Sequence, residues 1–380
     1  MLSETPSTRA SLGLLDRELR RRDFLKFCTL AAAAVGLPLK VAEQFAEAAV
    51  LGKKPSVIWL HFQECTGCTE SLLRTTAPAL DELILDLISL DYHETLLVPS
   101  GKLAEDVRHA AMEANAGKYV LIVEGAIPTK DGGIYCKIGG QTAIEMLNET
   151  AEKAGASIAI GSCASWRGIP SADPNPTGAV GAHEILKGKT VVSIPGCPAN
   201  PYNLLGTVLQ YATLGTLPEL DELARPKFAY GQTIHEHCPR RAHFDAGRFA
   251  LAYGDEGHRQ GWCLYRLGCK GPATHANCSV NHFNEVVGAW PIVLGHPCVG
   301  CTEQKLAFRV PLHDTVPIDR PPRSTVTRSE TAFTSCSLCE MKITVRPSSA
   351  IVRIVRKRAS ASCGVSTAVG SSRMRNRASR

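Results

Sequence analysis

Cysteine is the residue type that most constrains what this chain can form. Ten of its 15 cysteines fall, together with one histidine, into three sets along the 380 residues. Each set has a spacing typical of the ligands of an iron–sulfur cluster, because thiolates bind such clusters and an imidazole can replace one thiolate. Three clusters in series are typical of a path for single electrons. The sets are Cys65, Cys68, Cys163 and Cys197; His235, Cys238, Cys263 and Cys269; and Cys278, Cys298 and Cys301.

Length and composition are those of an ordinary globular protein. The chain is long enough for two domains, and its residues are 44% hydrophobic and 21% charged, a composition that can bury a core. The cysteine content is well below that of a small disulfide-rich scaffold. A disulfide framework is therefore an alternative that the size of the chain disfavours.

The formal net charge of +6 comes from the two ends of the chain. Residues 1–54 carry nine Lys and Arg against six Asp and Glu, and residues 321–380 carry 12 against two. Residues 55–320 are left with 21 basic and 28 acidic side chains, so this part is mildly acidic. Because nucleic-acid-binding proteins present a basic face, we expect no nucleic-acid partner for it.

Residues 1–49 have the pattern of an export signal. Arg21 and Arg22 begin the run Arg-Arg-Asp-Phe-Leu-Lys, which is typical of a twin-arginine signal. An apolar stretch follows at residues 30–39, and Ala46-Glu47-Ala48 offers a cleavage site of small residues. The alternative is a basic amphipathic helix on the mature protein. The twin-arginine route carries folded proteins, which suits a chain that acquires its clusters before export.

Residues 50–225 alternate short apolar runs with helical patterns. This alternation predicts an α/β fold with a parallel, doubly wound sheet. Helices are expected at residues 80–90, 103–115 and 142–153, and strands at residues 57–60, 95–98, 119–123, 157–160 and 191–194.

The first four cysteines follow strands of this predicted sheet. Cys65 and Cys68 come after the first strand, and Cys163 and Cys197 each come shortly after a later one. Because ligands of open parallel sheets bind beyond the carboxyl ends of the strands, we expect these four cysteines to meet. A Cys-x2-Cys pair alone would also fit zinc or a redox dithiol. Two buried structural pairs of cysteines are a further alternative.

Beyond about Pro226 the regular alternation fades. We expect residues 226–320 to have little regular secondary structure and to be ordered by metal ligation, which contributes folding energy. His235 is preferred to His237 as a ligand only because it completes the second set. The third set offers three thiolates, which can retain a three-iron cluster, and Pro291 has no side chain that binds iron. Zinc also takes Cys and His ligands, and the spacing does not exclude it.

Several motifs together resemble the small subunits of nickel–iron hydrogenases, from the export signal to about Pro321. In the first part the resemblance rests on Glu64-Cys65-Thr66-Gly67-Cys68-Thr69-Glu70-Ser71, Gly161-Ser162-Cys163-Ala164-Ser165 and Pro195-Gly196-Cys197-Pro198. In the second part it rests on Arg240-Arg241-Ala242-His243-Phe244, Leu267-Gly268-Cys269-Lys270-Gly271-Pro272 and Gly295-His296-Pro297-Cys298-Val299-Gly300-Cys301.

The resemblance implies a flavodoxin-like domain followed by a domain that holds further clusters. It implies a proximal 4Fe–4S cluster on the first set, a distal 4Fe–4S cluster on the second and a medial 3Fe–4S cluster on the third. Pro291 then stands where a fourth medial cysteine would be. It also implies an uptake hydrogenase whose nickel–iron site is on a separate large subunit, so this chain has no catalytic residue of its own. Its role would be to relay electrons to a membrane cytochrome b or a quinone-linked acceptor, in the periplasm or at the outer face of the cell membrane.

Two glycine positions indicate which kind of proximal cluster to expect. Oxygen-tolerant membrane-bound relatives have two further cysteines there, where this chain has Gly67 and Gly168. We therefore expect a proximal cluster with four cysteines. Cys136, in a glycine-rich segment, is expected to be a free thiol that is at least partly buried and not a ligand.

Residues 321–380 do not follow the family. This segment is rich in Ser and Arg and has no run near the roughly 20 apolar residues that a membrane span requires. We expect a disordered tail and no C-terminal transmembrane helix. Half a metal site at Cys336 and Cys339, or a shifted reading frame beyond about Pro321, are the alternatives.

Two other functions stay open at the level of the sequence. One is a stand-alone iron–sulfur electron carrier without a catalytic partner, and the other is an exported protein stabilised by zinc. Iron and sulfide analysis separates the zinc protein from the other two, because zinc binds without acid-labile sulfide.

Overall fold

The computed structural model describes residues 54–75, 83, 88–282, 289–306 and 308–316. All of them belong to one compact unit, within Met1–Ser324. The predicted export signal with Arg21 and Arg22, most of the helix expected at residues 80–90 and the tail at 321–380 lie outside the described residues.

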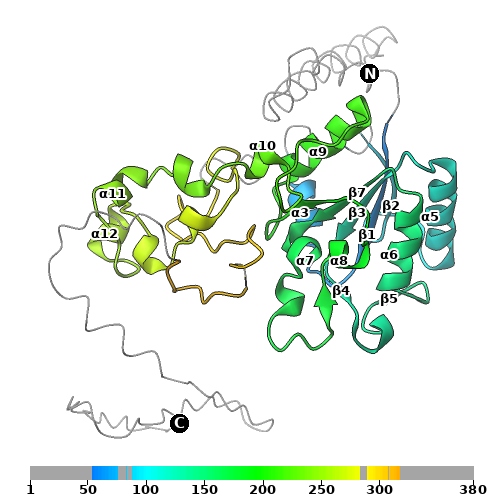
Figure 1. Ribbon diagram of the computed structural model, residues 1–380, viewed down its shortest axis with the longest axis horizontal. Coiled ribbons are helices and arrows are strands. Elements are labelled where there is room, and N and C mark those ends of the chain that lie inside the picture. The colour runs from blue at the N-terminus through cyan, green and yellow to red at the C-terminus, as the bar shows by residue number, and fades with distance from the viewer. Residues whose placement is uncertain (1–53, 76–82, 84–87, 283–288, 307, 317–380) are drawn as a thin grey trace, which may run out of the picture. The chain divides into compact units, whose positions relative to one another are not determined.

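A parallel sheet of five strands forms the centre of the first part (Figure 1). Its order is β2-β1-β3-β7-β9, and each neighbouring pair runs parallel. This order is that of flavodoxin-like sheets. In these sheets the order in which strands are added reverses between β1 and β3, which leaves a crevice at the carboxyl ends of these two strands. The predicted doubly wound α/β fold is therefore confirmed. The strands are β1 (Ser56–His61), β2 (Ser89–His93), β3 (Val120–Glu124), β7 (Ala156–Ile160) and β9 (Val191–Ile194).

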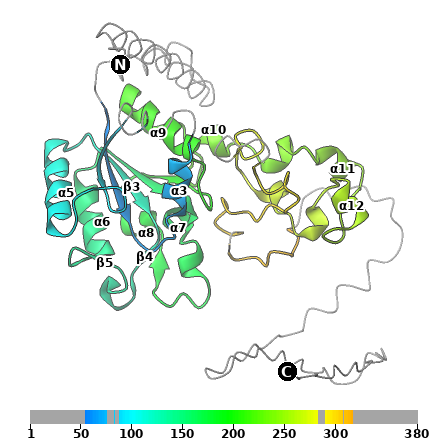
Figure 2. The ribbon, with the colours of Figure 1, turned by 180° about the vertical axis from the view of Figure 1, so that it is seen from behind.

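Helices on both faces of the sheet explain its continuous apolar strands. Val57 and Trp59 of β1 belong to one hydrophobic cluster, whereas Ile58 and Leu60 belong to the other. Because successive side chains of a strand point to opposite faces, a strand covered on both sides must be apolar throughout. The helix α9 (Pro201–Leu214) packs in the first cluster, and α5 (Lys102–Ala114) and α6 (Ala143–Glu152) pack in the second (Figure 2).

The ends of these helices follow from local sequence signals. Thr142 and Glu145 form a reciprocal capping box at the start of α6. Asn200 accepts a hydrogen bond from the backbone of Tyr202 at the start of α9, and Gly215 ends that helix in the left-handed conformation. The shorter elements of the first part are α3 (Gly67–Leu73), α7 (Gly161–Trp166), α8 (Ala182–Ile185), η2 (Lys130–Gly133), η3 (Ile169–Ser171), and the antiparallel pairs β4 (Ile127–Pro128) with β8 (Ala179–Val180) and β5 (Lys137–Ile138) with β6 (Gln141–Thr142).

The strand expected at residues 95–98 was wrong. The structure forms β2 earlier, at Ser89–His93, and residues 94–96 make a turn. β2 is the edge strand of the sheet, so the first three of its five residues are only partly buried and need no apolar side chains. The apolar run that indicated a strand is partly exposed, with Val98 96% accessible.

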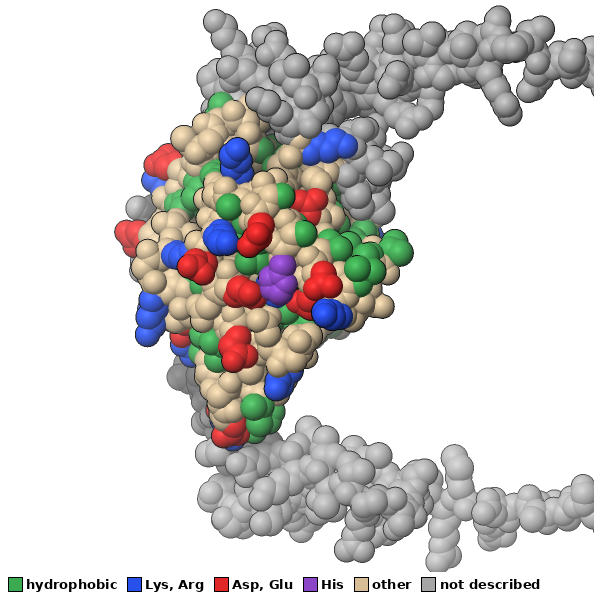
Figure 3. All heavy atoms as spheres, turned by 90° about the vertical axis from the view of Figure 1, so that its right-hand side faces the viewer, with side chains coloured by type: hydrophobic (Ala, Val, Ile, Leu, Met, Phe, Trp, Pro, Cys, Tyr) green, Lys and Arg blue, Asp and Glu red, His purple; other side chains and the backbone are tan. Residues whose placement is uncertain are grey.

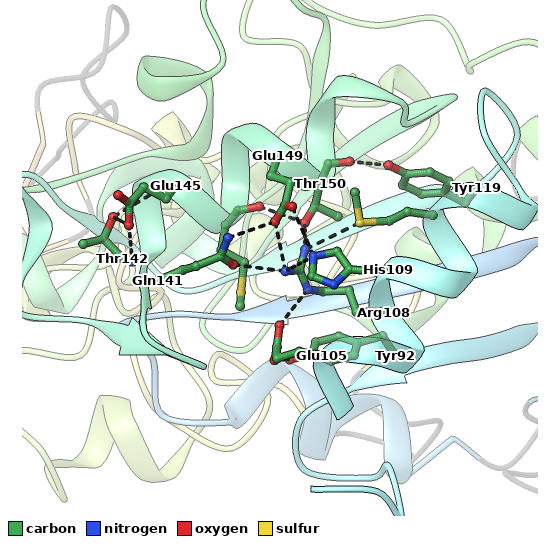
Figure 4. A network of polar contacts seen from close by, with 12 residues as sticks. Tyr92, Glu105, Arg108, His109, Tyr119, Gln141, Thr142, Glu145, Glu149 and Thr150 are labelled. Atoms are coloured by element: carbon green, nitrogen blue, oxygen red, sulfur yellow. Dashed lines mark hydrogen bonds and ion pairs between the residues drawn. The ribbon is translucent and has the colours of Figure 1, made fainter. Parts of the chain in front are cut away.

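A buried guanidinium joins α5 to α6 (Figure 4). Arg108 is fully buried and donates to the carboxylates of Glu105 and Glu149, at 3.0 Å each. It also donates to Thr150 at 2.8 Å and to Gln141 at 3.1 Å. A buried charge needs this degree of pairing, and the network fixes the two helices on their face of the sheet.

Charges of both signs cover the face that carries α5. Acidic and basic side chains lie interspersed there, with hydrophobic side chains between them and at one edge (Figure 3). Such a mixed surface is typical of the solvated side of an α/β domain.

The second part has little regular secondary structure, as expected. Its described elements are single turns: α10 (Lys227–Tyr230), η4 (Ile234–His237), α11 (Arg241–Asp245), α12 (Glu256–Arg259), η5 (Tyr265–Leu267) and η6 (Gly271–Ala273). Its apolar residues Ile234, Leu264, Trp290 and Ile292 join the same hydrophobic cluster as Val57 of the sheet. Of the helices that the structure describes, none has the length and apolar character needed to cross a membrane.

Candidate metal centres

The first set of cysteines lies beyond the carboxyl ends of three strands. Cys65 follows β1, Cys68 lies in the first turn of α3, Cys163 lies in α7 directly after β7, and Cys197 follows β9. Cys68 is buried, Cys163 is half-buried, and Cys65 and Cys197 are exposed. The four residues therefore line the edge of the sheet where ligands of this fold bind.

The thiols of this set share one environment. Burial, and then the neighbouring Cys197, raise the pKa of Cys163 to about 12. Burial raises the pKa of Cys68 well above its usual range, and Glu124, Cys163 and Cys197 act in the same sense. A cation bound among these sulfurs would lower the pKa values of the thiols and hold them as thiolates.

Glycines leave the space beside these sulfurs open. A Cβ on Gly161 would lie 2.5 Å from the Sγ of Cys68, and one on Gly168 would lie 2.6 Å from the Sγ of Cys163. A Cβ on Gly67 would lie 3.1 Å from the Sγ of Cys65. Any side chain at these positions would press on a thiol of the set.

The second set surrounds one cavity in the second part. His235 lies in η4, Cys238 follows that turn, and Cys263 and Cys269 flank η5. All four line one small pocket, together with apolar and basic neighbours that include Arg240. The structure thus brings the four predicted ligands to one place.

His235 is held in the form that can bind a metal. Its ring packs edge-on against Phe244, with 4.4 Å between the ring centroids. Burial, and then the charge of Arg241, lower the pKa of His235. The neutral imidazole has a free nitrogen lone pair for a metal.

The third set gathers three buried thiols. Burial, and then Cys301, raise the pKa of Cys278 to about 12, and burial raises the pKa of Cys301 to about 11. Burial is also the main cause of the raised pKa of Cys298, followed by Cys269 and Cys301. Pro291 lies in a nearby turn of the sequence, where its carbonyl accepts the backbone N–H of His296 at 2.8 Å.

Contacts between neighbouring segments connect the three sets in series. Cys197 of the first set lies close enough to Cys301 of the third to raise its pKa, and the backbone N–H of Cys298 in the third set donates to the Sγ of Cys269 in the second at 3.4 Å. The first and third sets are therefore adjacent, and so are the third and second.

Ser162 fastens the junction between the first and third sets. Its hydroxyl donates to the carbonyl of Cys301 at 2.5 Å and accepts the backbone N–H of Gly196 at 3.1 Å. Its own backbone N–H donates to the carbonyl of Gly196 at 2.8 Å. One residue thus ties together the segments that carry Cys163, Cys197 and Cys301.

The residues present fit iron–sulfur clusters. Every cysteine that the structure describes is a free thiol. The cysteines of the three sets are grouped, and all of them except Cys65 and Cys197 are at least partly buried. Backbone N–H groups point at Cys68, Cys269 and Cys298. Such N–H groups stabilise the sulfur ligands of a cluster. In the described part of the chain, no group of three or more His, Cys, Asp or Glu side chains gathers closely enough for a single metal ion.

Family models match both parts of the chain. The model for the C-terminal region of the NiFe/NiFeSe hydrogenase small subunit matches residues 230–312. The model described as NADH ubiquinone oxidoreductase, 20 Kd subunit, matches residues 65–211.

Known proteins resemble the chain along most of its length. It is 52% identical over 307 residues to the Hydrogenase-2 small chain of Escherichia coli K12, and the match covers 80% of this chain and 82% of that one. The chain belongs to the nickel–iron hydrogenase small-subunit family. It is also 49% identical over 292 residues to the periplasmic NiFe hydrogenase small subunit 1 of Nitratidesulfovibrio vulgaris, covering 76% of this chain and 91% of that one.

A solved structure agrees with this assignment. This small subunit superposes on a chain of the reduced, active Ni-Fe-Se hydrogenase of Desulfomicrobium baculatum with a TM-score of 0.65 and 34% identity. The match covers 69% of this chain and 100% of that one. As a hydrogenase small subunit, the protein is part of an oxidoreductase complex.

A carboxylate that the sequence analysis missed supports the first set of this small subunit. Glu124, the last residue of β3, accepts the backbone N–H groups of Cys68 at 3.0 Å and Thr69 at 3.3 Å. It also accepts the hydroxyl of Thr69 at 2.6 Å and the indole N–H of Trp59 at 3.1 Å. The only signal in the sequence was its position, a Glu at the end of the strand beside β1.

Further titratable groups are buried next to Glu124. His61 and His93 lie with their Nε2 atoms 3.3 Å apart, and Nδ1 of His61 is 3.3 Å from Glu64. Burial, and then His61, lower the pKa of His93 to about 3. Burial raises the pKa of Glu94 to about 7, and its buried Oε1 has no hydrogen-bond partner in the described structure.

A buried lysine lies between the second and third sets. Lys270 directly follows Cys269 and is completely buried. Burial lowers the pKa of its ammonium, while Cys298, Asp314 and Cys269 act in the opposite sense. Sequence reasoning noted this lysine only as part of a motif.

The remaining cysteines lie apart from the three sets or beyond the described residues. Cys136 is a half-buried free thiol, as expected, and burial raises its pKa to about 11. Cys28, Cys336, Cys339 and Cys363 lie outside the described residues.

Proposed function

We propose that this small subunit relays electrons from hydrogen oxidation, at a nickel–iron site on a large subunit, to an external acceptor. The protein is then one half of an uptake hydrogenase. The ligands we assign are Cys65, Cys68, Cys163 and Cys197 for a proximal 4Fe–4S cluster, Cys278, Cys298 and Cys301 for a medial 3Fe–4S cluster, and His235, Cys238, Cys263 and Cys269 for a distal 4Fe–4S cluster.

One observation carries this proposal: the three sets form a series without a break. Cys197 lies close enough to Cys301 to raise its pKa, and the Cys298 N–H donates to the sulfur of Cys269. When bound, clusters on these ligands would take up and release single electrons at potentials that the protein tunes. The hydroxyl of Ser162, which donates to the carbonyl of Cys301, and the N–H of Cys298 hold the neighbouring segments together, in the order proximal, medial, distal.

The two ends of the series differ in ways that suit electron transfer from the proximal to the distal site. Cys65 and Cys197 are exposed at the proximal end, where a large subunit would cover them. At the distal end, His235 offers a neutral ligand in place of a thiolate. One negative charge fewer raises the potential of the last site, which favours the arrival of electrons there.

The proposed location and acceptor rest on the sequence and on the family. The predicted twin-arginine signal at Arg21 and Arg22 and the periplasmic relative from Nitratidesulfovibrio vulgaris support export to the periplasm or the outer face of the membrane. A membrane cytochrome b or a quinone-linked protein is the acceptor that the family resemblance favours.

Anaerobic purification of the native protein tests the proposal. We expect a nickel-containing large subunit to copurify, and about 11 irons and 12 acid-labile sulfides in this chain, the sum for two four-iron clusters and one three-iron cluster. Clusters without a nickel-containing partner would identify a stand-alone electron carrier instead. Zinc without labile sulfide would identify a zinc-stabilised protein and overturn the proposal.

A further inference from the structure

The ammonium of Lys270 is buried in a cage of backbone carbonyl groups. Its Nζ lies 3.3 Å from the carbonyl oxygen of Gly268, which is on its own segment. It also lies 3.1, 3.2 and 3.4 Å from the carbonyl oxygens of Pro311, Leu312 and Asp314. One side chain therefore binds residues 311–314 to the segment that carries Cys269.

The four carbonyl oxygens around Lys270 require a hydrogen-bond donor and favour a positively charged one. A lysine ammonium has three N–H donors and no acceptor, and all four of these partners are acceptors. Carbonyl dipoles solvate the ammonium without cancelling its unit charge, and the carboxylate of Asp314 acts on it only electrostatically. A completely buried lysine is rare in proteins unless its charge has a use or a partner.

The backbone of Lys270 lies at the junction of the second and third sets. Its N–H donates to the carbonyl of Cys298 at 2.8 Å, and the N–H of Cys298 donates in turn to the Sγ of Cys269 at 3.4 Å. The two segments are thus held by a reciprocal pair of hydrogen bonds.

The side chain of Lys270 runs past the third set. Its Cδ lies 3.4 Å from the place that a Cβ on Gly300 would occupy. Gly300 stands between Cys298 and Cys301, and its left-handed backbone, with φ of +73°, leaves room for the lysine stem. Cys298 of the third set and Cys269 of the second both act electrostatically on the ammonium.

We propose that Lys270 is a positioning residue for both the medial and the distal sites, whose buried positive charge raises the reduction potentials of the two clusters. The proposal rests on the proposed function, because it takes the clusters as bound. Reduction adds negative charge to a site, and a nearby cation in a medium of low dielectric constant stabilises the reduced form. Removal of the charge then moves both potentials to more negative values.

Four variants of the complete hydrogenase complex test this. Lys270→Gln removes the charge but keeps an amide that donates to carbonyl groups, and Lys270→Met removes both. Lys270→Arg keeps the charge. Lys305→Met is the matched control, because it removes the same charge at an exposed position of the neighbouring segment.

The measurement is a redox titration of the medial and distal clusters, followed by electron paramagnetic resonance, with iron and sulfide content determined for each variant. We expect both midpoint potentials to shift to more negative values in Lys270→Gln and Lys270→Met. We expect those of Lys270→Arg and Lys305→Met to stay close to the wild type. Wild-type potentials in a fully loaded Lys270→Gln, or an equal shift in Lys305→Met, would overturn the proposal.

Loss of clusters is also informative. If the Gln and Met variants lose the medial or distal cluster while Lys270→Arg retains both, the charge is required to hold the sites together, which supports the proposal. Loss in Lys270→Arg as well would show a role in packing only and overturn it. Absence of clusters from the wild-type protein would instead contradict the proposed function, so the two failures are distinct.

Discussion

The Oε1 atom of Glu124 lies 3.0 Å from the backbone nitrogen of Cys68 and accepts its hydrogen bond. Glu124 ends the strand β3, and Cys68 lies in the first turn of the helix α3. The residue that precedes this helix, Thr66, gives it no side-chain cap, so the carboxylate from the neighbouring strand takes that role. The sheet thereby fixes the orientation of Cys68, one of the ligands we propose for the proximal cluster.

Replacement of Glu124 by Gln should weaken this attachment. An amide has a single acceptor oxygen, and its NH2 group would face the donors of Thr69 or Trp59. At least one buried donor then loses its acceptor, at a cost of about 1–3 kcal/mol. We expect a lower temperature of unfolding and less iron at the proximal site, measured by calorimetry and metal analysis. Glu113→Gln, at an exposed position on α5, is the control, and equal behaviour of the two variants would contradict the assigned role.

A methyl group on Gly161 should displace the proximal ligands. The new Cβ would lie 2.5 Å from the Sγ of Cys68. Gly188→Ala is a matched control, since its φ of +84° resembles the +78° of Gly161 but no atom lies within 4 Å of its new Cβ. Both variants carry the backbone cost of about 1–2 kcal/mol, whereas only Gly161→Ala should lose the proximal cluster in spectra of the purified protein. Full loading of Gly161→Ala would argue against a ligand role for Cys68.

Replacement of Cys298 by Ser should disable the middle of the relay. Serine is a poor ligand for iron in place of a thiolate, so the three-iron signal should vanish or change. Hydrogen-dependent reduction of dyes that accept electrons at the distal end should fall by about tenfold or more. Cys136→Ser removes a thiol outside the three sets and should leave both readouts unchanged. An intact spectrum with unchanged dye reduction in Cys298→Ser would refute the medial assignment.

Glu94 should make stability depend on pH. Its pKa is raised from 4.5 to about 7 by burial, so the folded state binds the proton more tightly than the unfolded state does. The contribution of this group to stability is full below about pH 4.5 and is lost as the pH rises through 7. Glu94→Gln should therefore stabilise the protein at pH 8 and have little effect at pH 4.5, by comparison of unfolding temperatures with the wild type. Glu222→Gln, at an exposed position, is the control for loss of a carboxylate. A benefit of Glu94→Gln that is the same at both pH values would exclude this role for Glu94.

The sequence predicted best those elements whose residues are buried on every side. The strand expected at residues 191–194 coincides with β9, and that expected at 157–160 is β7 without its first residue. A continuous apolar run in such a strand has no place other than the centre of the sheet. The edge strand β2 was missed because its sequence, Ser-Leu-Asp-Tyr-His, is largely polar. The more apolar run at residues 95–98 lies in the turn and bend that follow the strand.

The sequence revealed those site residues whose type has a special chemistry, namely the cysteines. It did not reveal site residues of common charged types. Cysteines after strands could be placed together, because the carboxyl ends of parallel strands share one edge. Glu124 and Lys270 belong to residue types that are common on any surface. Their burial arises from packing against distant parts of the chain, such as α3 for Glu124 and residues 311–314 for Lys270, which no local pattern records.

The hydrogen bonds of the Ser162 hydroxyl constrain the order in which the parts of the protein fold. It lies between strand ends that meet only when β7 and β9 pair, and it donates to the carbonyl of Cys301, 139 residues further along the chain. The loop that ends in Cys301 thus has no docking point until the sheet has formed. Assembly should consequently proceed outwards from the sheet, with each completed site serving as the template for its neighbour.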